Sequence, residues 1–144
     1  VMYDIVKNSS CPFVFVCHGL AASMGSIVPQ AAHEKGYRIT MPNCDWLIHD
    51  GSIDTGDMTM RQFNSYHGYM DAMRKHMLEI YSEVCSASGP KFKDMKHGSV
   101  KNFIRRKLQS KEDWWLTATE AVEHGFADGI YGSSGYESIG GMFE

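Results

Sequence analysis

The stretch Gly19-Leu20-Ala21-Ala22-Ser23-Met24-Gly25 decides how this chain is expected to fold. An apolar, β-prone run at 13–16 leads into it, and an apolar helical stretch at 27–32 leads out. A serine at such a strand-to-helix turn is presented to a substrate, and small residues beside it let backbone or substrate come close. The pattern therefore predicts a nucleophile at Ser23.

The segments around this turn alternate between the two kinds of secondary structure. Helices are expected at about 1–8 and 23–35, and strands at 12–17, 37–41 and 45–49. Strands separated by helices of this length indicate α/β layering.

A long helix is expected at about 57–85, because apolar residues recur there at alternating steps of three and four. The seam consists of Phe63, Tyr66, Met70, Met73, Met77, Ile80 and Val84. Such a helix would be about 40 Å long, longer than a compact domain of this size requires. The pattern alone leaves two interpretations open: a helix packed along its own domain, or one that projects and buries its seam against another subunit.

A basic segment at about 88–111 follows, with eight of the fourteen Lys and Arg residues. We interpret it as a solvated helix face with Phe103, Ile104 and Leu108 turned inward, rather than as a nucleic-acid site, because the rest of the chain is acidic. Further on, Thr117 and Glu120 form a capping box that predicts a helix ending near Gly125. A strand entry is expected at 126–130.

Composition narrows the class of protein. The 144 residues suit one domain, predicted at 1–131 with a flexible, Gly- and Ser-rich tail at 132–144. The net charge of −3, the hydrophobic content of 43% and the lack of a long apolar run or a secretory signal favour a cytoplasmic protein without a membrane partner. The four scattered cysteines predict reduced thiols, and no metal site is expected; a zinc site at Cys17 and His18 lacks a second pair.

Ser23 has two candidate partners for acyl-transfer chemistry. His49 ends a hydrophobic strand, and Asp113 stands ahead of a short helix and beside Trp114 and Trp115, whose bulk is expected to shield it. A hydroxyl that attacks, an imidazole that takes its proton and a carboxylate that orients the imidazole make up a Ser-His-Asp triad. The backbone N–H of Met24 would help to hold the oxyanion.

Three motifs in order resemble the proteolytic subunit of the Clp protease. They are the serine stretch at 19–25, the segment Met41-Pro42-Asn43-Cys44-Asp45-Trp46-Leu47-Ile48-His49, and the segment Asp113-Trp114-Trp115-Leu116-Thr117-Ala118-Thr119-Glu120 with the helix that follows to Asp128. The resemblance covers residues 1 to about 131.

The resemblance implies an α/β, crotonase-like fold with a long handle helix. It implies a serine peptidase in which Ser23 is the nucleophile, His49 the general base and acid, and Asp113 the orienting carboxylate. It further implies a ring or double ring formed through the handle, an ATP-driven AAA+ unfoldase as partner, and unfolded polypeptide as substrate. No cofactor is expected, because the unfoldase would use the ATP.

The chain departs from the family pattern in three places. It is expected to start late, without the family's N-terminal strands and without the Gly-Gly whose N–H completes the oxyanion hole. Loss of one oxyanion donor typically lowers turnover about a hundred- to a thousandfold. The glycine-rich handle strand reads Gly51-Ser52-Ile53-Asp54-Thr55-Gly56. The basic segment is an insertion.

Alternatives from other classes remain at this point. One is a catalytically impaired subunit that assembles with or modulates a complete peptidase, as the missing glycine pair suggests. Another is a phage head-maturation protease on the same fold. A crotonase-type acyl-CoA enzyme fits least, because it has no need of this triad.

Overall fold

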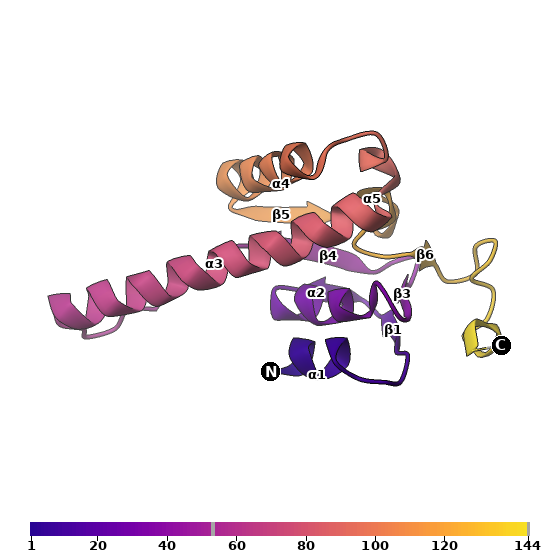
Figure 1. Ribbon diagram of the computed structural model, residues 1–144, viewed down its shortest axis with the longest axis horizontal. Helices are drawn as coiled ribbons and strands as arrows, with labels where there is room; N and C mark the ends of the chain where they lie inside the picture. Colours follow the sequence, from indigo (N-terminus) through magenta and orange to yellow (C-terminus); the bar gives the residue numbers. More distant parts are fainter. Residues whose placement is uncertain (53, 144) are drawn as a thin grey trace.

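A computed structural model describes residues 1–52 and 54–143. The chain forms a mixed α/β body from which one long helix projects (Figure 1). Residue 53, in the predicted handle strand, and residue 144, in the predicted tail, lie outside the described residues. The α/β class predicted from the sequence is confirmed; the crotonase-like classification stays a prediction.

Two three-stranded sheets organise the body. The first has the order β1-β3-β6 and is parallel throughout; it consists of β1 (Val14–Cys17), β3 (Tyr37–Thr40) and β6 (Gly129–Ile130). The second has the order β2-β4-β5, with β2 (Leu20–Ala22) parallel and β5 (Asp113–Leu116) antiparallel to β4 (Asp45–His49). The three strands of the second sheet carry or adjoin every predicted catalytic residue.

Two of these strands correct the sequence analysis. β2 occupies the stretch that was expected to be only a turn, and Asp113 opens a strand that was not predicted, ahead of the short helix that was. The strand at Asp113 reads exposed, buried, exposed, buried, so its two consecutive tryptophans face opposite sides of the sheet. Alternation of this kind is what a half-buried strand requires.

The helical segment after the Ser23 turn packs on the sheets, and the helix before the turn packs on that segment. α1 (Met2–Lys7) packs against the 3₁₀ helix η1 (Val28–Ala32), which continues α2 (Met24–Ile27) after Ser23. Pro29 at the start of η1 accounts for the change from α to 3₁₀ geometry, because proline supplies no N–H to an α-helical hydrogen bond.

The long helix α3 (Met60–Ser88) starts at a capping box in which Thr59 and Gln62 satisfy each other's backbone N–H. Its C-terminal half is core: Leu78, Ile80, Tyr81 and Val84 are buried. Its N-terminal half projects from the body, with Met60 and Phe63 exposed (Figure 1). The helix thus packs along its own domain at one end, as the first interpretation predicts, and projects at the other; burial of the projecting half against another subunit stays a prediction.

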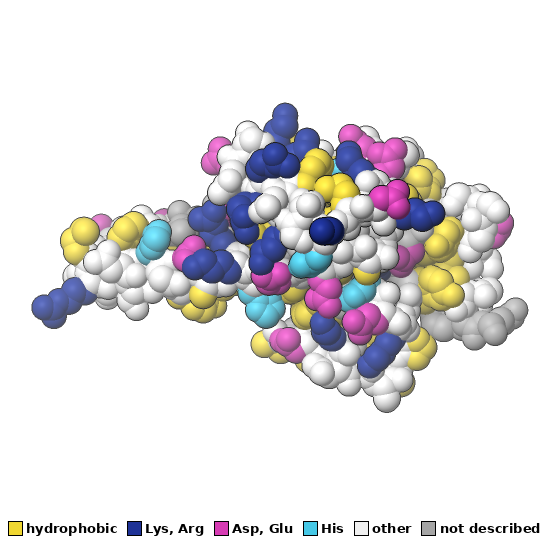
Figure 2. Space-filling model, turned by 45° about the horizontal axis from the view of Figure 1, so that its top comes forward, with side chains coloured by type: hydrophobic (Ala, Val, Ile, Leu, Met, Phe, Trp, Pro, Cys, Tyr) yellow, Lys and Arg dark blue, Asp and Glu magenta, His cyan; other side chains and the backbone are white. Residues whose placement is uncertain are grey.

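The basic segment contains the 3₁₀ helix η2 (Pro90–Phe92) and α4 (His97–Lys111), which lies along α3. Ile104 and Leu108 face the core as predicted, and Phe103 is partly buried. Lys and Arg side chains gather on the outer side of α4 (Figure 2).

The chain ends with three short elements. The predicted capping box at Thr117 and Glu120 is confirmed, and α5 (Ala118–His124) ends at Gly125, whose φ of 86° a side chain would disfavour. Gly125 also lies against the backbone of Gly89 with no room for a Cβ, which brings α5 close to the end of α3. After β6, the tail contains the 3₁₀ helix η3 (Gly140–Phe143).

The core lies between the second sheet, α3, α4 and α5. It is rich in aromatic side chains, among them Trp46, Tyr81, Phe92, Trp114 and Phe126. In the described part of the chain, no helix combines the length and the apolar character that a membrane span needs.

Candidate active site

Ser23 stands on a strained turn at the end of β2. Its φ of 54° and ψ of −124° make it one of only two described non-glycine residues with positive φ, the other being Glu112. Such a conformation costs on the order of 1–3 kcal/mol and occurs where a nucleophile is presented at a strand-to-helix turn. The Ser23 N–H donates to the carbonyl of Leu47 at 3.0 Å, which holds the turn against β4.

Two buried hydroxyl groups support this turn from behind. Ser26 Oγ donates to the Ser23 carbonyl at 2.6 Å, and the Tyr81 hydroxyl lies 2.8 Å from the same Oγ. Since the carbonyl can only accept, the Ser26 proton is committed to it, and Tyr81 is the donor in the second bond. Burial raises the pKa of Tyr81 far above its ordinary value, so the phenol keeps the proton that it donates.

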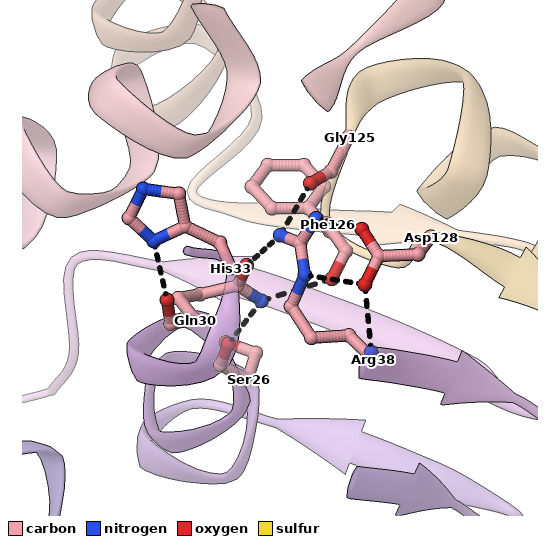
Figure 3. A network of polar contacts seen from close by, with 7 residues as sticks. All are labelled: Ser26, Gln30, His33, Arg38, Gly125, Phe126 and Asp128. Carbon is pink, nitrogen blue, oxygen red and sulfur yellow. Dashed lines mark hydrogen bonds and ion pairs between the residues drawn. The ribbon is translucent and has the colours of Figure 1, made fainter. Parts of the chain in front are cut away.

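A buried polar network fixes the helix that follows Ser23 (Figure 3). The guanidinium of Arg38, fully buried on β3, pairs with Asp128 and donates to Gln30 Oε1 and the Gly125 carbonyl, each at 2.7 Å. The Gln30 amide in turn donates to the Ser26 and Phe126 carbonyls. The network therefore ties the Ser23 helix to β3 and to the end of α5.

His49 and Asp113 lie directly opposite each other on neighbouring strands. The antiparallel register of β4 and β5 pairs the two residues, and His49 Nδ1 lies 3.3 Å from Asp113 Oδ1. When the carboxylate accepts from Nδ1–H, the neutral ring has its lone pair on Nε2, the form that a general base needs. Nε2 is buried and has no hydrogen-bond partner among the described residues.

The surroundings of Asp113 differ from the prediction. Its side chain is 55% exposed, so the tryptophans do not shield it. Trp114 is turned into the core, and Trp115, which shares the face of Asp113, is itself 55% exposed. The outer face of the second sheet is therefore open to solvent beside the His49–Asp113 pair.

All three predicted catalytic residues lie on or next to the second sheet. Ser23 directly follows β2, which pairs with β4 in a register that sets Ala22 opposite Leu47, two residues before His49. Within the described part of the chain, no hydrogen bond joins the Ser23 hydroxyl to His49. Met24, the predicted oxyanion donor, is the first residue of α2, so its N–H has no carbonyl partner within the helix.

An open pocket runs along the His49–Asp113 pair to the root of the projecting helix. Arg74 of α3 forms an ion pair with Asp50 at 2.7 Å on its rim. The described residues after Asp50 (51–52 and 54–56) are not in a strand, in contrast to the predicted handle strand. The pocket is lined by Leu47, His49, Asp50, Gly51, Ser52, Arg74, Leu108, Gln109, Glu112 and Asp113.

Sequence reasoning missed Ser26 and Tyr81, the residues that hold the Ser23 turn. Ser26 carried a weak signal, a hydroxyl three residues after the nucleophile. Tyr81 carried none, because 55 residues separate it from Ser26. Among the described residues, His33, Glu34 and Glu83 are the one group that brings three potential metal ligands together, although the sequence predicted no metal site.

Comparison with known proteins gives consistent matches. The family model described as Clp protease matches residues 1–134. A curated ATP-dependent Clp protease proteolytic subunit of Leuconostoc citreum is 27% identical over 133 residues, 92% of this chain and 59% of that protein. The Porphyromonas gingivalis protein of the same name is 28% identical, over 90% of this chain and 51% of its own length.

A third relative is the ATP-dependent Clp protease proteolytic subunit 1 of Chlamydia trachomatis serovar D, 30% identical over 90% of this chain and 60% of that protein. The chain thus spans between half and three fifths of the length of these relatives. The match of the family model to nearly the whole chain agrees with the fold and with the three motifs. The chain belongs to the Clp protease family.

Proposed function

We propose that this chain is a serine endopeptidase subunit of a Clp-type ATP-dependent protease and that Ser23, His49 and Asp113 are its triad. The observation that carries the proposal is the His49–Asp113 pair, with Nδ1 and Oδ1 3.3 Å apart and Nε2 unpartnered, on the strand next to Ser23. The names of the curated relatives support the same activity.

The proposed chemistry has two half-reactions, and in each of them His49 first takes a proton and then gives it up. Ser23 Oγ attacks the peptide carbonyl carbon while His49 Nε2 takes its proton, and the backbone N–H of Met24 donates to the oxyanion. His49 then passes the proton to the leaving amine, and a water molecule repeats the sequence to release the acid. Asp113 holds the ring and stabilises its positive charge. The missing Ser23–His49 hydrogen bond is consistent with this scheme, because such bonds often tighten only with substrate bound.

Labelling with a fluorophosphonate probe tests this assignment. We expect the probe to modify Ser23, and Ser23→Ala and His49→Ala to abolish the label. Ser65→Ala, at an exposed serine on the projecting part of α3, is the matched control and should label like the parent chain. Absence of label on the folded parent chain would contradict the proposal. It would favour the second candidate, a catalytically impaired subunit that modulates a complete peptidase. The lack of a hydrogen bond between Ser23 and His49 is the observation that favours this candidate.

We also propose that the projecting half of α3 binds other subunits in a ring or double ring. Members of the family typically oligomerise. Met60, Phe63 and Tyr69 are exposed there, as is Met58 just before the helix, and hydrophobic side chains are visible along this arm (Figure 2). Burial of such apolar surface is the main driving force of association. The solution mass should exceed that of a monomer in the parent chain and fall in Phe63→Glu; a monomeric parent chain at high concentration would contradict this.

The remaining parts of the proposal follow from the family. The substrate is unfolded polypeptide, delivered by an AAA+ unfoldase that binds and hydrolyses the ATP, so this chain needs no cofactor for peptide hydrolysis. Stimulation of peptide cleavage by a Clp unfoldase tests the partnership.

A further inference from the structure

A second group of chemically active side chains lies apart from the Ser23 sheet. His33 and Glu34 follow η1, and Glu83 is on the core half of α3. Each offers one ligand atom, and these atoms all lie within 4.8 Å of one another. The proposed peptidase chemistry uses none of the three.

The His33 ring is held in one orientation. Its side chain is only 6% exposed, and Nδ1 lies 3.0 Å from the Gln30 carbonyl. Since a carbonyl only accepts, Nδ1 carries the proton, and in the neutral ring the lone pair is on Nε2. Metal-binding histidines are typically oriented in this way, through a hydrogen bond from the other ring nitrogen to a carbonyl or carboxylate.

Gln30 is itself immobilised. Its side chain bonds to Arg38 and to the Ser26 and Phe126 carbonyls, so the carbonyl that orients His33 belongs to a fixed residue (Figure 3). In the figure, the second ring nitrogen of His33 lies on the side away from Gln30. It makes no hydrogen bond within the described residues, and Glu34 Oε1 lies 3.7 Å from it.

These distances suit a small divalent ion. Zinc binds imidazole nitrogen and carboxylate oxygen at about 2.0–2.2 Å, so two such ligands of a tetrahedral ion are roughly 3.3–3.6 Å apart. The 3.7 Å between His33 Nε2 and Glu34 Oε1 is close to that separation. Glu34 and Glu83 are exposed, so changes of side-chain rotamer can bring both carboxylates to one ion.

The charges near the cluster also favour a cation. Tyr3 and Lys7 of α1 are its neighbours: the pKa of the Tyr3 hydroxyl is raised, mainly by burial, with Lys7 lowering it and Glu83 and Glu34 raising it. The Glu34 and Glu83 carboxylates thus act on the same hydroxyl, and a bound cation would relieve the repulsion between two such neighbouring carboxylates.

We propose that His33, Glu34 and Glu83 bind a divalent transition-metal ion of the zinc type, which links the segment after the Ser23 helix to α3. One nitrogen and two oxygen ligands from protein, with at least one position left for water, form a known kind of zinc site. No local sequence pattern indicates this site, because its ligands come from two segments about fifty residues apart.

Zinc titration of the full chain, followed by calorimetry, tests the proposal. Every sample carries Cys11→Ser, because Cys11 is an exposed thiol that would bind zinc by itself. We expect one ion per chain and at least about tenfold weaker binding in His33→Gln and in Glu83→Gln. The control is His76→Gln, which removes an exposed histidine from the same helix and should bind like the Cys11→Ser chain.

Three outcomes would overturn the proposal: no saturable binding to the folded chain, unchanged affinity in Glu83→Gln, or an equal loss in His76→Gln. Glu83 is exposed, so its substitution keeps the test valid even where His33→Gln fails to fold. Circular dichroism of each metal-free variant establishes folding. None of these measurements depends on peptidase activity.

Discussion

The two sides of the candidate active site are built in opposite ways. Behind Ser23, the side chains of Ser26, Tyr81 and Arg38 are fully buried. Ser26 is hydrogen-bonded to Tyr81, and Gln30 links Arg38 to the Ser26 carbonyl. In front, Asp113 is half exposed and touches His49 through one contact of 3.3 Å. The nucleophile is held by a rigid polar interior, whereas the Asp113 carboxylate that pairs with His49 faces solvent.

The difference separates stability from chemistry. When a buried polar group loses its hydrogen-bond partner, the free energy of unfolding falls, because water cannot replace the lost bond. An exposed ion pair contributes little stability, about 0–1 kcal/mol. Substitutions in front should therefore change reactivity and leave the fold intact. Substitutions behind should lower stability, and they should change reactivity only where the lost contact holds the Ser23 turn.

The largest expected effect is on the reactivity of Ser23 and comes from a substitution at Asp113. Asp113→Asn should slow fluorophosphonate labelling of Ser23 by about 10⁴-fold, because the amide favours the wrong imidazole tautomer. The free energy of unfolding, measured in urea, should change by less than about 1 kcal/mol. The matched control is Glu112→Gln, which removes the neighbouring carboxylate. If both variants label equally fast, Asp113 does not orient His49.

The next largest expected effect is on stability and comes from a substitution in the buried network behind Ser23. Arg38→Met should lower the free energy of unfolding by about 3 kcal/mol or more, because it strands the Asp128 carboxylate and Gln30 without their partner. Urea denaturation measures the loss. Arg106→Met, at an exposed arginine of α4, should cost less than about 0.5 kcal/mol. Similar losses in the two variants would mean that the buried network contributes no more than a surface charge.

Local patterns predicted the parts of this arrangement that depend on neighbouring residues. The strand that ends at His49 was found with its bounds, because a short apolar run followed by Asp50-Gly51 is a local signal. The capping box at Thr117 was found for the same reason. β5 was missed because two consecutive tryptophans conceal the alternation of a strand whose neighbours point to opposite faces.

The features that sequence patterns did not predict depend on contacts between segments that are distant in the sequence. The α3 seam has one period throughout, and only the extent of the body decides that Val84 is buried and Phe63 exposed. The support of Ser23 by Tyr81, and the exposure of Asp113 beside Trp115, likewise follow from how the second sheet meets α3. The three triad candidates were taken from motifs, which name residues without giving the distance between their side chains.

A smaller effect is expected at Tyr81, where a buried residue behind Ser23 should influence both stability and the reactivity of Ser23. Tyr81→Phe removes the hydroxyl that donates to Ser26 and should cost about 1 kcal/mol of unfolding free energy. It should also slow labelling of Ser23 by about three- to a hundredfold, since a loosened Ser26 holds the nucleophile turn less firmly. Tyr69→Phe, at an exposed tyrosine of the same helix, is the control and should match the parent chain in both measurements. Full labelling speed in Tyr81→Phe would show that the turn does not need this bond.

The smallest expected effect concerns the support behind the Asp113 strand, and it depends on pH. His124 is 4% exposed among Trp114, Phe92, Phe103 and Phe126, and burial lowers its pKa below the ordinary value of 6.5. The unfolded chain therefore binds the proton more readily than the folded chain. The stability that this residue contributes is complete above about pH 6.5 and is lost as the pH falls toward the lower, folded-state pKa, by at most about 1.4 kcal/mol per pH unit.

His124→Phe isolates this contribution, because the ring stays in the aromatic cluster and the titration is removed. Between pH 6.5 and 5 the unfolding free energy of the variant should decline less steeply than that of the parent chain. His76→Gln, at an exposed histidine, should keep the steepness of the parent chain. If the unfolding free energies of the parent chain and His124→Phe fall equally steeply with pH, the acid sensitivity comes from another residue. The aromatic cluster behind Asp113 would then contribute no pH dependence to stability.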